Sequence, residues 1–216
     1  MHLAVAIPNR QLNDNNQEIE YAVGIPASLR GQAIILFEQA FGVKLGLANP
    51  NDEGRHQLLT KALHLDYAIA AIRHDGLVGL AGFKTDDGAF TGGISYRRLI
   101  DNLGVIQGNR AAWVLSLYAR KPIPGELVMD GIAVHKDVRG CGVGGRLLSE
   151  LRKHAVANGY DQIRLDVIDT NRAARRLYER NGFVASETRT FEYLRWLLGF
   201  GNSTTMIQHL RGASID

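Results

Sequence analysis

The sequence predicts an α/β domain in which a mixed β-sheet is flanked by helices. Short apolar runs of strand length alternate with stretches of helical spacing, and two of these runs form an early hairpin. With 216 residues and 45% hydrophobic composition, the chain can bury one sizeable core. No repeat, low-complexity tract or linker interrupts the sequence, so we expect a polar leader over residues 1–18 and one domain over residues 19–216.

The first half of the chain is expected to contain strands and helices in mixed order. In sequence, these are a strand at 19–23, a helix from Ser28 to Gly42, a helix at 55–64, strands at 67–73 and 77–84, and helices at 95–103 and 109–118. Ser28 is a typical helix N-cap, and Gly42 is a typical stop. His74, Asp75 and Gly76 separate two apolar runs, which is typical of a hairpin.

The second half predicts a regular alternation of strands and helices. Its elements are a strand at 127–134, a helix at 142–158, a strand at 163–168, a helix at 171–180, and strands at 183–186 and 205–210. Val143, Leu147 and Leu151 recur on one helical face, and Gly159 follows where a C′ glycine belongs.

Composition excludes several classes of protein. The net charge of +3 and the lack of a Lys/Arg run argue against a nucleic-acid partner. A lone cysteine, Cys141, excludes a disulfide framework and a Cys-rich zinc site, so we expect no metal and a reducing compartment. The N-terminus lacks the pattern of a signal peptide, and no run is long enough to span a membrane. We therefore expect a cytoplasmic protein without membrane association.

A glycine-rich segment between a strand and a helix, Val134–Gly145, is the most informative part of the chain. Such a loop turns backbone N–H groups toward one point at a helix N-terminus, which suits a phosphate or pyrophosphate. Arg139 and Arg146 flank the glycines. A turn without any ligand is the plain structural alternative.

A dinucleotide fingerprint is the second alternative for this loop. Gly140, Gly142 and Gly145 fit G-x-G-x-x-G, and Asp161 follows about 20 residues later. However, five residues separate Val134 from the first glycine, and too few strand–helix units follow for a Rossmann sheet. A Walker A loop is excluded because no Gly-Lys-Ser/Thr is present.

Two segments resemble the signatures of the GNAT superfamily of N-acetyltransferases. The first, GIAVHKDVRGCGVGGRLL, fits Arg/Gln-x-x-Gly-x-Gly/Ala through Arg139, Gly142 and Gly144. The second is LDVIDTNRAARRLYERNGF, in which the matching positions are Asn171, Ala174, Leu177-Tyr178 and Gly182-Phe183. The two segments occur in the family order and cover about residues 126–184.

This resemblance implies a mostly antiparallel central sheet with a splayed pair of parallel strands that holds acyl-CoA. It also implies a bulge in the central strand, for which Gly131 is the candidate. The donor would be acetyl-CoA. The residues expected to bind it are Asp130, Ile132, Ala133, Val134, Arg139, Gly140, Cys141, Gly142, Val143, Gly144, Gly145, Asn171 and Tyr178.

The implied reaction is direct attack of a neutral primary amine on the thioester. The resemblance makes Tyr178 the candidate proton donor to the leaving thiolate and Glu126 the candidate base. Each residue also has a structural interpretation: Tyr178 as a core residue, Glu126 as a solvated carboxylate with water as the base, and Asn171 as a helix N-cap. A nucleophilic role for Cys141 is disfavoured, because the loop leaves little room for an acyl acceptor.

The acceptor amine could belong to a small molecule or to a protein. Residues 187–203 contain Phe191, Tyr193, Trp196 and Phe200, which could form a pocket, a homodimer contact or a short buried helix. The functional alternative is a non-catalytic acyl-CoA sensor. The presence of Tyr178, Glu126 and Asp130 favours catalysis.

Overall fold

The computed structural model describes residues 18–48, 52–74, 76–93, 97, 99–101, 104–105, 122–192 and 195–210. The strands are β1 (Glu20–Val23), β2 (Ala68–Arg73), β3 (Gly76–Lys84), β4 (Glu126–Val134), β5 (Gln162–Ile168), β6 (Val184–Thr190) and β7 (Asn202–His209). The helices are α1 (Arg30–Ala48), α2 (Asp52–Ala62), α4 (Val143–Ala157), α5 (Arg172–Arg180) and α6 (Arg195–Leu198). Of the helices in these ranges, none is both long enough and apolar enough to cross a membrane.

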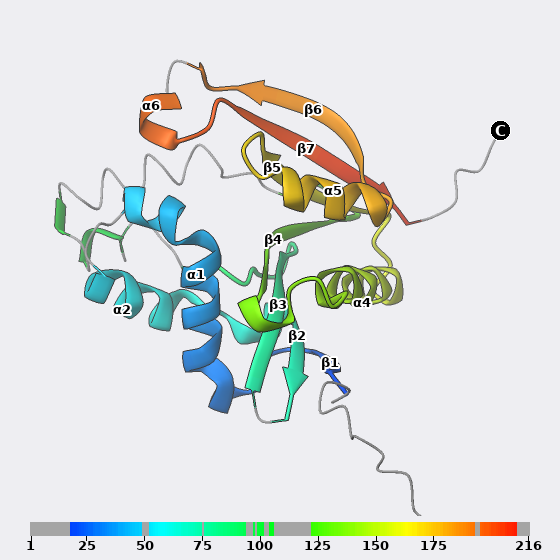
Figure 1. Ribbon diagram of the computed structural model, residues 1–216, viewed down its shortest axis with the longest axis horizontal. Coiled ribbons are helices and arrows are strands. Elements are labelled where there is room, and N and C mark those ends of the chain that lie inside the picture. Colours follow the sequence, from blue (N-terminus) through cyan, green and yellow to red (C-terminus); the bar gives the residue numbers. More distant parts are fainter. Residues whose placement is uncertain are drawn as a thin grey trace, which may run out of the picture.

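One seven-stranded sheet organises the molecule, in the order β1-β2-β3-β4-β5-β7-β6 (Figure 1). Neighbouring strands are antiparallel except for β4 and β5, which are parallel. The mixed, mostly antiparallel sheet is therefore confirmed. A Rossmann sheet is parallel throughout its nucleotide-binding half, so this topology contradicts the dinucleotide interpretation of the glycine loop.

Helices cover both faces of the sheet (Figure 1). α4 and α5 enclose one core, whose most buried members include Leu147, Leu151 and Ile163. α1 and α2 enclose a second core on the opposite face, which contains Leu59 and Phe90. The apolar periodicity of residues 143–155 explains why α4 buries one side, because Val143, Leu147, Leu148, Leu151 and Ala155 are its buried residues.

A β-bulge interrupts β4. Gly82 of β3 pairs with Gly131, but the next residue, Phe83, pairs with Met129, so Asp130 is an extra residue in β4. The bulge expected beside Gly131 is thereby confirmed. It shifts the alternation of faces by one residue. Leu127 and Met129 face the α4 core before the bulge, and Ile132 and Val134 pack against that core after it.

Several element boundaries differ from the sequence prediction. The first helix does not begin at Ser28, because residues 27–29 form a 3-10 turn, and it continues through Gly42 to Ala48. A helical glycine costs only about 1 kcal/mol relative to alanine, which its helix-forming neighbours offset. The last two strands are also longer than predicted and enclose α6. Residues 1–17 of the leader, and most of the predicted helices at 95–103 and 109–118, lie outside the described residues.

Candidate functional site

The parallel pairing of β4 and β5 stops after three residue pairs, and this leaves a gap in the sheet. The last pair is Val128 with Arg164, although β4 continues to Val134 and β5 to Ile168. Beyond the last pair, β4 still pairs with β3 and β5 still pairs with β7. The edge of β4 beyond Val128 therefore does not pair with β5, and its backbone N–H and C=O groups can hydrogen-bond an extended ligand.

The glycine loop follows directly from this free edge. Gly140 and Gly142 have φ of +83°, a left-handed conformation that side chains rarely adopt. A Cβ at either glycine would meet no heavy atom within 4 Å, so the space above the loop is open. Gly142 is the N-cap of α4, and the N–H groups of the following turn have no partner within the helix. These groups and the helix dipole form an anion site.

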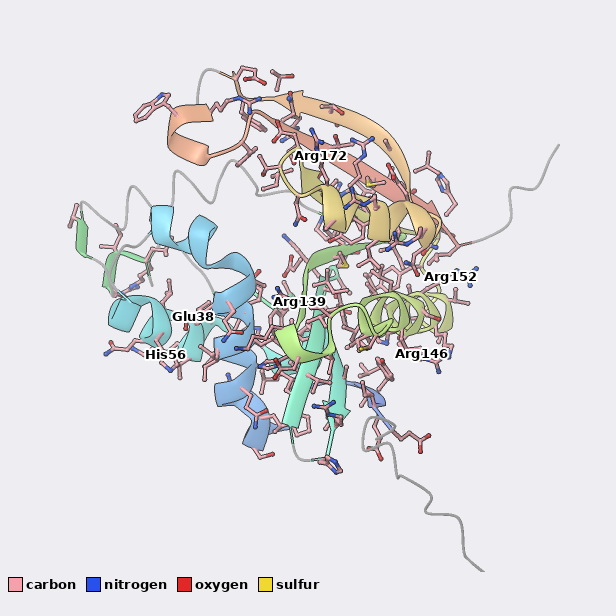
Figure 2. All side chains as sticks on the ribbon, in the orientation of Figure 1. Glu38, His56, Arg139, Arg146, Arg152 and Arg172 are labelled. Carbon is pink, nitrogen blue, oxygen red and sulfur yellow. The ribbon has the colours of Figure 1, made fainter. Side chains whose placement is uncertain are left out.

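Two of the arginines near this loop are directed differently. Figure 2 labels Arg139 where β4 runs into the loop, and Arg146 on α4. Arg139 Nε donates a hydrogen bond to the Val134 carbonyl, 3.0 Å away, so the side chain folds back over the end of β4. Arg146 instead pairs with Glu150 at 2.9 Å and lies over the ring of Tyr21, at 5.8 Å from its centroid. Of these two arginines, Arg139 is the one held at the junction of β4 and the loop.

Helix α5 lies against the start of α4. A Cβ added to Gly144 would lie 3.1 Å from Leu177 Cδ2, so a glycine is needed for this close approach. Asn171 is the N-cap of α5, and its Oδ1 accepts a hydrogen bond from the Ala174 N–H at 3.1 Å. The structure thus shows the capping role of Asn171. Its expected contact with a ligand stays a prediction, as do those of the loop residues.

Tyr178 is buried in the α4–α5 core, with its ring 6.0 Å from that of Phe183. Burial raises the pKa of the Tyr178 phenol well above its ordinary value, because the phenolate would lose its hydration. The hydroxyl therefore stays protonated at all ordinary pH values and keeps a proton that it can donate. Cys141, by contrast, is exposed on the loop, with its Sγ 4.0 Å from the Arg139 carbonyl oxygen.

Glu126 lies at the closed end of the β4–β5 pair rather than in the gap. Its Oε2 forms an ion pair with Arg164 Nη1 at 3.1 Å, and its Oε1 accepts from Gln162 Nε2 at 3.0 Å. The residue is 2% exposed, which contradicts the expectation of a solvated carboxylate at a strand start. Both carboxylate oxygens are occupied, so Glu126 has a structural function whatever else it does.

Asp130 is the carboxylate that the bulge places at the mouth of the gap. Its Oδ2 accepts hydrogen bonds from Thr91 Oγ1 at 2.9 Å and from the Thr91 N–H at 3.3 Å. Desolvation raises the pKa of the Asp130 carboxyl, and the hydrogen bonds from Thr91 oppose this effect. Because Thr91 follows Phe90 of the second core, Asp130 faces the α1 side of the sheet.

A separate hollow of about 350 Å³ lies between α1, the β2–β3 hairpin and the residues that follow β4. It is lined by Gln32, Ile35, Leu36, Gln39, Arg73, His74, Gly76, Leu77, Val78, His135 and Asp137. None of the predicted site residues lines it. Within the described residues, no group of three or more His, Cys, Asp or Glu side chains could hold a metal ion.

Comparison with known proteins places this site in a family. Residues 47–183 match the model of the "Acetyltransferase (GNAT) family". This chain belongs to the GNAT acetyltransferase family. The resemblance seen in the sequence is confirmed, and the matched range includes the free β4 edge, the loop and α5. No curated protein gives a significant match to the chain.

Solved structures show the same GNAT fold. A crystal structure described as an acetyltransferase is 18% identical, with 89% of this chain and 100% of that chain covered and a TM-score of 0.58. The ribosomal-protein-S18-alanine N-acetyltransferase from Escherichia coli is 16% identical, with 92% and 98% covered and a TM-score of 0.57. A Bacillus subtilis acetyltransferase in complex with CoA is 14% identical, with 90% and 100% covered and a TM-score of 0.55. At these identities, the likeness concerns the fold alone.

The GNAT signatures do not point to two polar residues that the fold brings near the gap. Thr91 lies in the loop that follows β3, and its contact with Asp130 spans 39 residues. Arg164 lies within the otherwise apolar strand IRLDVI, on the same face of the sheet as Glu126. A charged residue inside an apolar strand indicates a buried ion pair. The partner of Arg164 cannot be identified without the parallel register of β4 and β5, which brings Glu126 close to it.

Replacement of Asp130 by Asn is expected to stabilise the fold at neutral pH. Because the pKa of Asp130 is raised in the folded state, charging the carboxyl costs stability above that pKa, and the cost disappears as the pH falls toward the unfolded value of about 4. A gain of about 1 kcal/mol would raise Tm by about 2–4 °C. Thermal unfolding at pH 8 and pH 4 measures the difference.

The exposed turn residue Asp86 provides the control for this experiment, since Asp86→Asn should leave Tm unchanged at both pH values. A variant Asp130→Asn that is less stable than the wild type at pH 8, or equally shifted at both pH values, would show that the carboxylate is not desolvated.

Proposed function

We propose that this protein is an N-acetyltransferase that transfers the acetyl group of acetyl-CoA to a primary amine. The observation that carries the proposal is the parallel β4–β5 pair, which separates after Val128 and Arg164 beside an open glycine loop at a helix N-terminus. The gap suits an extended amide-containing chain, and the loop suits a pyrophosphate. CoA joins these two chemical parts in one molecule.

The residues fit this donor in two places. The free edge of β4 at Asp130–Val134 would hydrogen-bond the pantetheine arm, and the N–H groups of Gly142–Gly145 would hold the pyrophosphate. When bound, acetyl-CoA supplies an activated acyl thioester. The CoA complex of the Bacillus subtilis acetyltransferase with this fold supports the assignment. The alternative is a sensor that binds acyl-CoA without catalysis. Such a sensor does not need a proton-transfer residue near the gap, whereas this chain has Asp130 and Tyr178 as candidates.

Proton removal from the acceptor ammonium is assigned to Asp130 rather than to Glu126. An ammonium with a pKa of about 10 must lose a proton before it attacks, and a base works best when its own pKa approaches the working pH. Burial moves the pKa of Asp130 in that direction. Glu126 is already committed to Arg164 and Gln162, so we assign it a structural role.

Tyr178 remains the candidate donor to the leaving thiolate. Burial raises the pKa of its hydroxyl and keeps the proton in place, so the hydroxyl can donate a hydrogen bond to the leaving thiolate. The helix that carries Tyr178 contacts the loop through Leu177 and Gly144. We also propose a small-molecule or protein amine as the partner, no nucleic-acid partner, and a cytoplasmic location.

CoA binding is expected to be lost in the variant Gly142→Glu. The substitution forces a side chain into a left-handed backbone position and places a negative charge where the pyrophosphate would lie. Titration calorimetry with CoA, acetyl-CoA and NAD measures the effect, with at least about a 100-fold loss of affinity expected for both CoA compounds.

Gly159 offers a matched control for this variant. It also has a positive φ, with no atom within 4 Å of an added Cβ, but it follows the opposite end of α4. Gly159→Glu should therefore bind CoA as the wild type does. If Gly142→Glu binds CoA normally, or if the wild type binds NAD in preference to CoA, the proposed donor site is wrong.

The assignment of the base is tested by two carboxylate-to-amide variants. Asp130→Asn should remove the acid limb of the pH profile of kcat/KM and lower the plateau by about 100-fold. Glu126→Gln should keep the shape of the profile, because it removes only a buried ion-pair partner of Arg164. A profile that loses its acid limb in Glu126→Gln alone would return the role of base to Glu126.

A further inference from the structure

Arg164 is a buried cation at the point where β4 and β5 separate. It belongs to the last residue pair of the parallel ladder, opposite Val128. The residue is 8% exposed, although arginine is rarely this buried in proteins unless all its donors are paired. Its Nη1 is paired with Glu126 Oε2 at 3.1 Å.

Among the residues that the structure describes, none pairs with the other edge of the guanidinium group. Nε and Nη2 of Arg164 are both shielded from solvent, and neither donates a hydrogen bond within the part of the chain that the structure describes. Leaving buried donors unpaired is costly, and the cost is larger for a charged group. Nε–H and Nη2–H are the two parallel donors of an arginine fork, whose geometry matches the two oxygens of a carboxylate.

Glu126 holds this fork in a fixed orientation. The carboxylate is itself fixed by Gln162 Nε2 on one oxygen, so the Nη1 end of Arg164 cannot turn freely. A fork that is oriented in advance loses little side-chain freedom when it binds an anion. The pair thus combines an inner edge neutralised by Glu126 with an outer edge whose two donors are unpaired within the described residues.

The face on which Arg164 lies is the one left to the acceptor. Leu127 and Ile163 belong to the α4 core, so Glu126 and Arg164, one position away along each strand, face the opposite side of the sheet. The glycine loop starts α4, so a CoA held there approaches from the α4 side. Asp130 shares the Arg164 face. It lies on β4 two residues beyond Val128, which is a rise of about 7 Å along that strand.

We propose that the acceptor amine also carries a carboxylate, which the Nε–Nη2 edge of Arg164 binds. This inference rests on the proposed acetyltransferase function. A single negative charge fits better than a phosphate, because Glu126 already pairs with Arg164 and Asp130 adds a second carboxylate on the same face of the sheet. The separation of Asp130 from Arg164 favours an amine and a carboxylate joined by several bonds.

Paired acceptors test the proposal in the unmodified protein. Linear amino acids from glycine to aminohexanoate are compared, each with its own carboxamide, by the release of CoA from acetyl-CoA. At the best chain length, the carboxylate should exceed its amide by at least about 100-fold in kcat/KM, because the amide leaves the fork unpaired. Equal rates within every pair would overturn the inference and leave a buried water as the occupant of the fork.

The variant Arg164→Lys provides the second readout. Lysine keeps a positive charge beside Glu126 but lacks the fork, so the preference for carboxylates should fall to less than about 10-fold while CoA affinity stays unchanged. Arg152→Lys, on the exposed part of α4, is the matched control and should keep the preference (Figure 2). If Arg164→Lys does not fold, the comparison of each carboxylate with its carboxamide in the wild type still tests whether the acceptor carries a carboxylate.

The outcomes separate the two proposals. Acetylation of neutral amines without any preference for the carboxylate refutes the role of Arg164 and leaves the acetyltransferase assignment intact. Tight CoA binding without acetylation of any amine refutes the catalytic assignment and, with it, this inference.

Discussion

The site depends on one constraint, which is the early end of the parallel ladder between β4 and β5. Only three residue pairs join the two strands, whereas β5 and β7 pair along seven. The bulge at Asp130 redirects β4 and exchanges the faces of its later residues. As a result Ile132 and Val134 still reach the α4 core, and their backbone edge toward β5 stays free. Without the bulge, these side chains would face away from the α4 core wherever the backbone edge is turned toward β5.

Charge is distributed unequally between the two sides of this opening. The α4 side provides helix N–H groups and Arg139 for a polyanionic donor, while the opposite side buries three groups: Glu126, Asp130 and Arg164. Buried charges are costly unless they are paired, and here the pairing is incomplete at the Arg164 fork. An acceptor that supplies both an amine and a carboxylate would complete the pairing at Asp130 and Arg164. The low dielectric that makes unpaired buried charges costly would then strengthen these contacts.

Local patterns in the sequence were sufficient for the sheet strands, for α4 and for the glycine loop, because each depends on short-range periodicity or on glycine at a fixed spacing. They were insufficient for the extent of α1, where helix formation on both sides of Gly42 outweighs the local stop signal. They also could not show how Glu126 is used. Its partners Arg164 and Gln162 are 38 and 36 residues away, and only the parallel register brings them together.

Hydrogen exchange with and without CoA tests the central claim most directly, because it reports on backbone amides one by one. Bound CoA should slow exchange at the β4 edge, Asp130–Val134, and in the first turn of α4, Val143–Gly145, and leave α1 and the β2–β3 hairpin unchanged. Protection confined to the hollow beside α1, at Gln32, Leu77 and His135, would place CoA outside the gap and contradict the account.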